Sequence, residues 1–253
     1  LAPHVAYTPG SPFSPSPLAR QNDAGTGTTH IWDVWNAKDY LAYREHRPQF
    51  VSEFGWQGPP TWATLVATIH DEPMTPESPG MLVHQKAAAG NEKLTRGLVP
   101  HFRLPREMPD WHWAMSLNQA VAIRTAVEWF RSLAPACAGA IVWQLNDCWP
   151  VTSWSAVDYL GRAKPMLYAL RSANQPRLLT LQPGDDGLVL TALNDTDDAW
   201  TCAVALTRRA FDGTVLAHAA VSLDVPRRGA AAASVPASLT AQLSDGGVMI
   251  IPV

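Results

Sequence analysis

The sequence carries little excess charge of either sign. Its 253 residues include 19 Lys and Arg against 22 Asp and Glu, which gives a formal net charge of -3 at pH 7. The basic residues are scattered along the chain instead of being gathered into one stripe. A protein without a strong field attracts neither nucleic acid nor anionic lipid by long-range electrostatics. We therefore expect no nucleic-acid partner and no membrane partner.

Long hydrophobic runs are also missing. No apolar stretch approaches the roughly 20 residues that a membrane-spanning helix needs. The opening residues, LAPHVAYTPG, lack the basic and then apolar order of a signal peptide. These absences predict a soluble chain and favour the cytoplasm over secretion. The chain begins with Leu instead of Met, so we expect that an upstream portion, with any targeting signal, has been removed.

Cysteine is scarce, and the sequence has no metal-binding pattern. The three cysteines, Cys137, Cys148 and Cys202, are far apart and form neither a dense disulfide framework nor a CxxC pair. We expect all three to be buried free thiols. The eight histidines show no HExxH or similar ligand spacing. The sequence therefore predicts no metal and no other cofactor.

Tryptophan is abundant but unevenly placed. Ten of the eleven Trp residues lie between Trp32 and Trp154, and the last 78 residues contain Trp200 alone. With 47% hydrophobic residues, the chain can bury one large core or two smaller ones. The change in composition predicts two domains, with a boundary between residues 1–175 and residues 176–253.

Two apolar segments of the first domain end in polar and aromatic side chains. Residues 49–54 form a short apolar run that ends in SEFG, and residues 139–147, GAIVWQLND, repeat the pattern. Between them, a helix is predicted from Asp110, as the capping residue, to Phe130, before Pro135 stops it. Strands whose ends carry functional groups, joined by a helix, are typical of an α/β barrel.

The segments that flank this region differ from it in composition and in the pattern of apolar residues. Residues 8–30 are crowded with Pro, Gly, Ser and Thr, and they predict a long loop that is either a frayed terminus or the lining of an active site. From Arg177 onward, short alternating runs separated by GDDG, NDTDD, FDG and PRRG predict the strands and turns of a β-sandwich. The Ala-rich residues 229–239 are interrupted by Pro236, so no helix is predicted there.

Glu53 is the candidate for chemistry. It lies close to Phe50, Phe54 and Trp56; aromatic faces stack on sugar rings, and a carboxylate can attack an oxocarbenium-like centre. Residue types alone favour a plainer role, in which Glu53 anchors a loop through backbone N–H groups. In the same way, a group of Trp residues is more often core than sugar platform.

Four motifs in a fixed order decide between these interpretations. They are YTPGSP at residues 7–12, HIWDVW at 30–35, RPQFVSEFGWQ at 47–57 and GAIVWQLNDCWPVTSWSAVDYLGRAKP at 139–165. Together they resemble the C-terminal portion of a family 2 glycoside hydrolase of the β-mannosidase type, over most of residues 1–180. The resemblance implies an α/β fold, the C-terminal part of a TIM (β/α)8 barrel, over residues 1–175. An all-β, immunoglobulin-like sandwich then follows over residues 176–253.

The resemblance also implies an activity and roles for single residues. It implies an exo-acting, retaining enzyme that removes terminal β-D-mannose by double displacement from an oligosaccharide or glycoside. Glu53 matches the nucleophile that ends the seventh barrel strand, and Trp143, on the eighth, matches the floor of the mannose subsite. Asn146 and Asp147, grouped with the substrate-binding residues, hold that strand end and its loops in shape. Contacts to substrate hydroxyls, or support of the nucleophile, are expected near the sixth strand, from His30, Trp32, Asp33 and Trp35.

The second carboxyl group of this mechanism is missing upstream. In the resembling family, the acid/base is the Glu of an Asn-Glu pair that ends the fourth barrel strand, before the nucleophile. The pair in this sequence, Asn91-Glu92, follows Glu53 and lacks an apolar strand before it, so we expect a surface or helical position. A closed barrel also takes about 250 residues. The resemblance therefore implies a fragment, inactive alone, whose partner is the missing N-terminal part of the same enzyme.

Two alternatives remain open. Other family 2 enzymes, such as β-galactosidases, β-glucuronidases or exo-glucosaminidases, share the barrel and the nucleophile. An inert carbohydrate-binding module is the alternative outside the enzymes. Such a module is expected to carry exposed aromatic residues on its sandwich, where this sequence has Trp200 as its one tryptophan.

Overall fold

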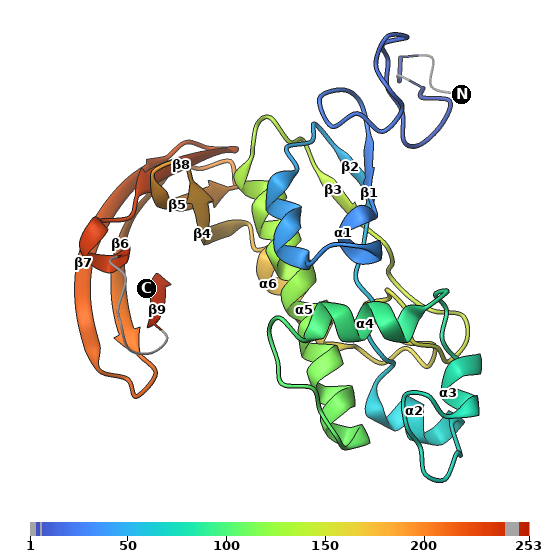
Figure 1. Cartoon of the computed structure of the whole chain (residues 1–253). Coiled ribbons are helices and arrows are strands. Elements are labelled where there is room, and N and C mark those ends of the chain that lie inside the picture. The colour runs from blue at the N-terminus through green and yellow to red at the C-terminus, as the bar shows by residue number, and fades with distance from the viewer. Residues whose placement is uncertain (1–3, 6, 241–247, 253) are drawn as a thin grey trace. The chain divides into compact units, whose positions relative to one another are not determined.

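The computed structural model describes residues 4, 5, 7–240 and 248–252, with side chains described as far as residue 240. The chain divides into two compact units (Figure 1). The first unit comprises Leu1–Phe130 and Ala136–Ala173, and the second comprises Arg131–Pro135 and Asn174–Val253.

The first unit contains a parallel sheet of three strands, in the order β1 (Thr29–Ile31), β2 (Val51–Phe54) and β3 (Ala140–Val142). His30 stands opposite Glu53 in the register of β1 and β2. Parallel strands need long crossover connections, which helices supply. The connections contain α1 (Asp33–Asn36) and the 3-10 helix η1 (Tyr40–Glu45), then α2 (Trp62–Thr68), α3 (Pro79–Val83), α4 (Gly90–Leu98) and α5 (Met108–Ser132), while α6 (Pro165–Ala173) follows β3.

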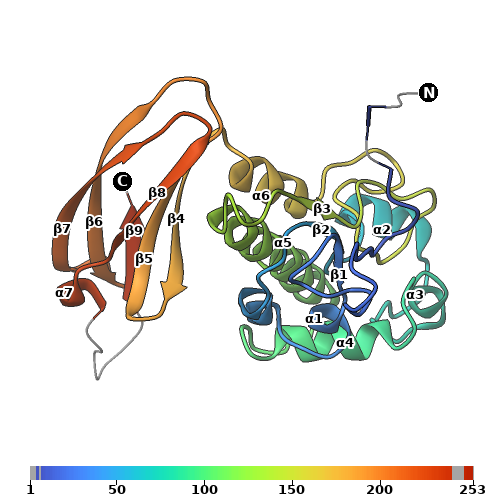
Figure 2. The same ribbon diagram turned by 90° about the horizontal axis from the view of Figure 1, so that it is seen from above.

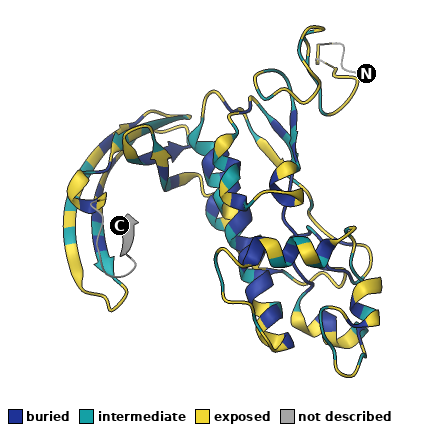
Figure 3. Ribbon diagram, viewed as in Figure 1, coloured by how far each residue is buried: buried dark blue, intermediate teal, exposed yellow. Residues whose placement is uncertain are grey.

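The helix α5 is the main scaffold of the first unit. Fourteen of its 25 residues are buried, and buried segments of the helix are dark blue in Figure 3. Among them, Met115, Ile123 and Phe130 are spaced seven or eight residues apart, which places them on one side of the helix. The predicted helix is confirmed, but it begins at Met108, so Asp110 lies in its first turn and is not its cap. Even α5 is not apolar enough to cross a membrane, and no other described helix is long and apolar enough.

The outer strand β3 is more exposed than its apolar sequence suggests. Val51 and Phe54 of the middle strand β2 are fully buried, whereas Ala140 and Ile141 of β3 are exposed, Ile141 to 56%. Within the described part of the chain, β1 and β3 each pair with β2 and with no second strand. An apolar strand with an unpaired edge is a surface to which another strand can add.

The second unit consists of two antiparallel sheets of three described strands each (Figure 2). One sheet has the order β4–β5–β8, and the other has the order β7–β6–β9. Buried side chains from β5 of one sheet and from β6 and β7 of the other share one apolar core, as in sheets that pack face to face. The strands are β4 (Arg177–Gly184), β5 (Gly187–Asn194), β6 (Trp200–Ala210), β7 (Val215–Val225), β8 (Gly229–Ser234) and β9 (Val248–Pro252).

Two local expectations need correction. The Ala-rich segment forms β8, but a short helix, α7 (Ala237–Thr240), follows Pro236, since a proline can precede a helix that it could not continue. Cys137 and Cys202 are buried free thiols as expected, whereas Cys148 is exposed. Cys148 lies outside the strands and helices, in the loop after β3, and loops run over the surface.

Candidate active site

Glu53 lies near the C-terminal end of β2, beside the end of β1. Its side chain is 29% exposed. Its Oε2 atom accepts a hydrogen bond of 3.0 Å from Trp32 Nε1, and His30 Nδ1 lies 3.5 Å from the same oxygen. Among the described residues, these two supply the polar contacts of the carboxylate, and neither contact involves Oε1. One carboxylate oxygen is therefore held in place while the other is available.

The Pro-rich segment before β1 holds His30 from two sides. Ser11 Oγ lies 2.8 Å from His30 Nε2. Asn22 binds the backbone of His30, since its Oδ1 accepts from the N–H at 2.6 Å and its Nδ2 donates to the carbonyl at 2.9 Å. A bridge between Phe13 and Thr28 ties the segment together next to β1. The segment is thus an ordered neighbour of the candidate site, and nothing in its local sequence had singled out Ser11 or Asn22.

Trp143 follows β3 and lies beside the end of β2. Its backbone N–H donates to Phe54 O at 2.8 Å, and the residue is 42% exposed. Gly55 permits this approach, because a Cβ atom there would lie 2.4 Å from Trp143 O. The same Cβ would lie 3.1 Å from ring carbons of Trp32 and Trp154. An accessible indole and a carboxylate at neighbouring strand ends offer a ring face and a nucleophile, the two groups that sugar chemistry uses.

Trp35 belongs to the core of the first unit. It is 1% exposed and packs edge-on against Trp56 and Trp154, with ring centroids 5.3 and 6.3 Å apart. Trp154 in turn packs edge-on against Trp32 at 6.0 Å. The Trp35 ring thus packs against Trp154, which in turn packs against Trp32, the hydrogen-bond donor to Glu53.

Asp33 contacts Lys38 and His46 rather than Glu53. Its Oδ2 lies 3.3 Å from Lys38 Nζ and 3.4 Å from His46 Nε2, and its side chain is 42% exposed. Asp33, His30 and His46 line one hollow of about 300 Å³. Among the described residues, no group of three or more His, Cys, Asp or Glu side chains is arranged to hold a metal ion. Asp33 is therefore open to a ligand in that hollow but does not touch the carboxylate of Glu53.

Asp147 is a buried carboxylate that organises the loop after β3. Its side chain is 1% exposed. It accepts hydrogen bonds from Ser153 Oγ at 2.6 Å, Ser155 Oγ at 2.5 Å and Gln144 Nε2 at 3.1 Å. Asn146 is exposed, and its Nδ2 donates to Asp147 O at 3.3 Å. Asp147 therefore shapes the loop and is closed to a ligand, whereas Asn146 is accessible.

Two further buried side chains hold the segment that follows Glu53. Gln119 of α5 donates from Nε2 to Trp56 O at 2.8 Å and to Ser153 O at 3.2 Å. Lys164 donates from Nζ to Gly58 O at 3.0 Å. These contacts join residues that are 34 to 106 positions apart in the chain. No local pattern could have revealed them, because periodicity reports only on near neighbours.

Lys164 is a strongly perturbed titratable group within this scaffold. Its burial lowers the pKa of the ammonium group to about 7, although the carboxylates of Asp147 and Asp158 oppose the shift. A buried amine with two carbonyl acceptors and nearby carboxylates can hold loops together without reaching solvent.

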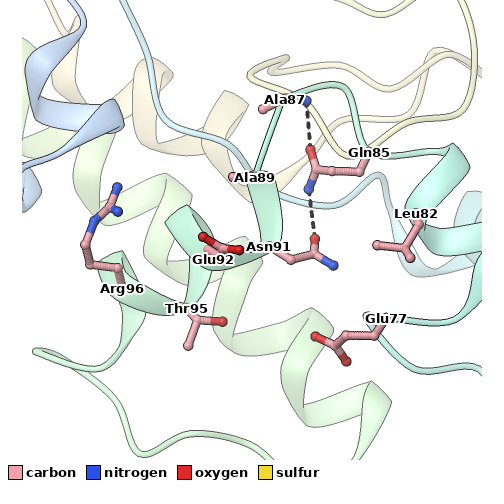
Figure 4. Close-up of a pocket in the computed structure, with 10 residues that line it drawn as sticks. Glu77, Leu82, Gln85, Ala87, Ala89, Asn91, Glu92, Thr95 and Arg96 are labelled. Atoms are coloured by element: carbon pink, nitrogen blue, oxygen red, sulfur yellow. Dashed lines mark hydrogen bonds between the residues drawn. The ribbon is translucent and has the colours of Figure 1, made fainter.

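The Asn91-Glu92 pair lines a hollow of about 750 Å³ formed by α3, α4 and the segment between them (Figure 4). Gln85 Nε2 donates to Asn91 Oδ1 at 2.9 Å, and Asn91 Nδ2 donates to Pro76 O at 2.6 Å. The amide of Asn91 is thus used to hold the chain. Glu92 is exposed in the first turn of α4. The expected surface and helical position of this pair is confirmed.

Curated proteins with similar sequences are fungal β-mannosidases. The chain is 31% identical over 182 residues to Beta-mannosidase B of Aspergillus flavus, and 33% identical over 188 residues to Beta-mannosidase B of Thermothelomyces thermophilus. Each alignment covers 70% of this chain, but only 21% and 22% of the relatives. The chain thus spans about a fifth of the length of the curated relatives that it matches. No family model matches it.

Solved structures agree with the sequence relatives. A β-D-mannosidase from Dictyoglomus thermophilum has a TM-score of 0.81 and 29% identity, and covers 85% of this chain and 27% of its own. An exo-chitosanase from Amycolatopsis orientalis, at a TM-score of 0.67 and 20% identity, covers 83% of this chain and 26% of its own, and shows a shared fold. The resemblance that the motifs indicated is confirmed: the chain is similar to one portion of a β-mannosidase-type glycoside hydrolase.

Proposed function

We propose that the chain is part of a retaining exo-glycosidase that removes terminal β-D-mannose, with Glu53 as the nucleophile. The observation that carries the proposal is the state of the Glu53 carboxylate. Trp32 and His30 hold its Oε2 at 3.0 and 3.5 Å, while the side chain stays 29% exposed at a strand end. A carboxylate that only anchored a loop would accept backbone N–H groups, as N-capping side chains do.

In the first step of the proposed reaction, Glu53 attacks the anomeric carbon and forms a glycosyl ester. The bond to the leaving oxygen breaks, and that oxygen keeps the electron pair and takes a proton from an acid group. Water then attacks the anomeric carbon and gives a proton to the same group, while the ester bond to Glu53 breaks and its electron pair returns to the carboxylate. The free sugar therefore keeps its configuration. The indole of Trp143, accessible at the next strand end, offers a face against which the sugar ring can stack.

The acid/base is proposed to come from residues outside this chain. Asn91-Glu92 is unsuited, because its amide is engaged with Pro76 and Gln85 and Glu92 lies on a helix. We propose that β1, β2 and β3 are the sixth to eighth strands of a (β/α)8 barrel, and that the sandwich of the second unit is immunoglobulin-like. The one-sided pairing of β1 and β3, with Ile141 exposed, supports further strands at these edges.

The site residues divide by their access to a ligand. Trp32, His30, Asp33 and Asn146 are accessible enough to contact sugar hydroxyls or the ring. Trp35 and Asp147 are closed off, and their proposed part is to keep the site in shape. We expect hydroxyl recognition to come from the first group and from residues that this chain does not contain.

The proposal is tested with p-nitrophenyl β-D-mannoside and two polypeptides, this chain alone and a longer one that supplies an upstream barrel segment. We expect that only the longer polypeptide hydrolyses the substrate. Its Glu53→Gln variant should lose about 10³-fold or more of the hydrolysis rate, equivalent to about 4 kcal/mol of transition-state stabilisation. Glu92→Gln is the matched control and should keep full activity. Proton NMR of the first-formed mannose should show the β anomer.

Two results would contradict the proposal. Aryl release by the chain alone, abolished by Glu53→Gln, would show that no outside acid/base is needed. Full activity of the Glu53→Gln variant in the longer polypeptide would remove Glu53 as nucleophile. Peptide mass mapping after treatment with 2-deoxy-2-fluoro-β-D-mannosyl fluoride gives an independent check, since its fluoride leaves without an acid and the label should stay on Glu53.

A second candidate within the same class is an exo-glucosaminidase, since the fold is shared with an exo-chitosanase at a TM-score of 0.67. Faster hydrolysis of the aryl β-D-glucosaminide than of the β-D-mannoside would favour it. The binding-module alternative is weakened at Trp200, because the guanidinium of Arg177 lies over its ring, 5.6 Å from the ring centroid. The β-mannoside is therefore the first substrate to test.

A further inference from the structure

Ser11 is the residue whose contacts carry the inference furthest, because they decide which nitrogen of His30 carries hydrogen. Ser52 donates its hydroxyl hydrogen to Thr29 O at 3.4 Å, and Ser11 donates its own to Ser52 Oγ at 2.9 Å. A hydroxyl has one hydrogen to give. The oxygen of Ser11, 2.8 Å from His30 Nε2, must therefore accept from that nitrogen.

The other nitrogen of His30 then faces Glu53. Nδ1 lies 3.5 Å from Glu53 Oε2. With Nε2 already the donor to Ser11, a second ring proton can sit only on Nδ1, where it points toward the carboxylate. Without that proton, a nitrogen lone pair would face an anionic oxygen, which is unfavourable. The contact with Ser11 thus leaves Nδ1 as the nitrogen that faces Glu53.

We propose that Ser11 is a positioning residue, which holds His30 with Nε2 as donor so that the Nδ1 proton is directed to Glu53 Oε2. The proposal rests on the proposed role of Glu53 as nucleophile. Because Trp32 and His30 both bind Oε2, the attacking atom is Oε1. Asn22 completes the support by fixing the backbone of His30 on both sides.

The arrangement acts differently in the two steps of the reaction. When Oε1 bonds to the anomeric carbon, the negative charge of the carboxylate is lost and the Nδ1 proton loses its anionic acceptor. When water displaces Glu53 from the anomeric carbon, the electron pair of the ester bond returns to Oε1 and the charge reappears beside the Nδ1 proton. His30 therefore stabilises Glu53 as the leaving group of the second step.

Other titratable groups near His30 are already paired. Asp33 and His46 line the same hollow, and they lie 3.4 Å from one another, with Lys38 also on Asp33 at 3.3 Å. Among the groups in contact with the His30 ring, Glu53 is the carboxylate. The segment that contains Ser11 and Asn22 is thus assigned to the catalytic apparatus, which agrees with one of the two interpretations that its Pro-rich sequence left open.

Nitrogen NMR of this chain, labelled with ¹⁵N-histidine and without substrate, tests the proposal. His30→Gln assigns the two ring signals by their disappearance. In the wild-type chain at neutral pH we expect a protonated Nε2. Ser11→Ala should shift both His30 signals toward a mixture of tautomers, and Ser11→Thr, which keeps the hydroxyl, should restore them. Ser16→Ala is the matched control on the same segment, since Ser16 Oγ accepts only from Leu18 N at 3.3 Å.

The Glu53→Gln chain provides the second measurement. Without the anion beside Nδ1, the contact at that nitrogen changes, so the Nδ1 signal should shift more than the Nε2 signal. An unprotonated Nε2 in the wild-type chain, or identical spectra for Ser11→Ala and wild type, would overturn the proposal. The NMR experiment measures no turnover, so it can be interpreted even if the β-mannosidase assay shows no activity. Conversely, a negative NMR result does not change what the β-mannosidase assay shows about Glu53.

Discussion

Lys164 gives the most direct test of the scaffold around Glu53. Its ammonium group is fully buried, and this burial lowers the pKa from 10.5 to about 7, with Asp147 and Asp158 opposing the shift. In the unfolded chain the group titrates near its ordinary value. Between pH 7 and about pH 10, the unfolded chain therefore binds one proton more than the folded chain. The free energy of unfolding should rise with pH across this window.

The magnitude follows from the two pKa values, 10.5 and about 7. Each unit corresponds to about 1.4 kcal/mol, so carrying the proton on Lys164 costs the folded state up to about 5 kcal/mol. Between pH 7 and pH 9, the free energy of unfolding of the wild type should rise by about 2 kcal/mol relative to that of a Lys164→Met variant, which has no titratable group at position 164.

Urea unfolding at pH 7, 8 and 9, followed by tryptophan fluorescence, measures this difference. The signal reports the first unit, because ten of the eleven Trp residues lie within it. Lys38→Met is the control: hydrogen bonds to Glu45 and Asp33 raise the pKa of Lys38, so it stays charged over this range. Parallel curves for wild type and Lys164→Met would refute the reasoning, since they would mean that Asp147 and Asp158 outweigh burial.

The same unfolding assay tests two further features. Asp147→Ala removes the acceptor of three hydrogen bonds and should lower the free energy of unfolding by about 3–5 kcal/mol. Asp33→Ala, at an exposed ion pair, should lower it by only about 0–1 kcal/mol. Equal losses for the two variants would contradict the assigned roles. Gly55→Ala places a methyl group 2.4 Å from Trp143 O and should cost about 1–3 kcal/mol. Gly10→Ala, which meets nothing within 4 Å, should stay within about 0.5 kcal/mol, and an equally silent Gly55→Ala would disprove the close approach.

The strand ends could be predicted because their signals are local. An apolar run that stops at SEFG places Glu53 near the end of β2, and the run before WQLND places Trp143 just after β3. Helix α5 could also be predicted from the spacing of its apolar residues, apart from its first residues. Such signals act over a few residues, so they fix where an element lies without saying what it touches.

The contacts that shape the site could not be predicted, because they join distant parts of the chain. Ser11 lies 19 residues before His30, and Gln119 lies 63 residues after the carbonyl that it binds at Trp56. Residue type misleads as well. Trp35 and Trp143 both belong to motifs of the resemblance, yet Trp35 is 1% exposed and Trp143 is 42% exposed. Their difference comes from tertiary packing, which no periodicity encodes.

In the proposed reaction, the groups that hold the nucleophile are separate from the group that transfers a proton to the leaving oxygen. Among the described residues of this chain, Trp32 and His30 contact the carboxylate of Glu53, and Ser11 contacts the far nitrogen of His30. The donors to Oε2 are in place before any sugar binds, which is the condition for electrostatic stabilisation without reorganisation at the moment of reaction. An acid from another segment then needs only to arrive at the right distance. The ¹⁵N signature of His30 should therefore be present in this chain even where hydrolysis is not.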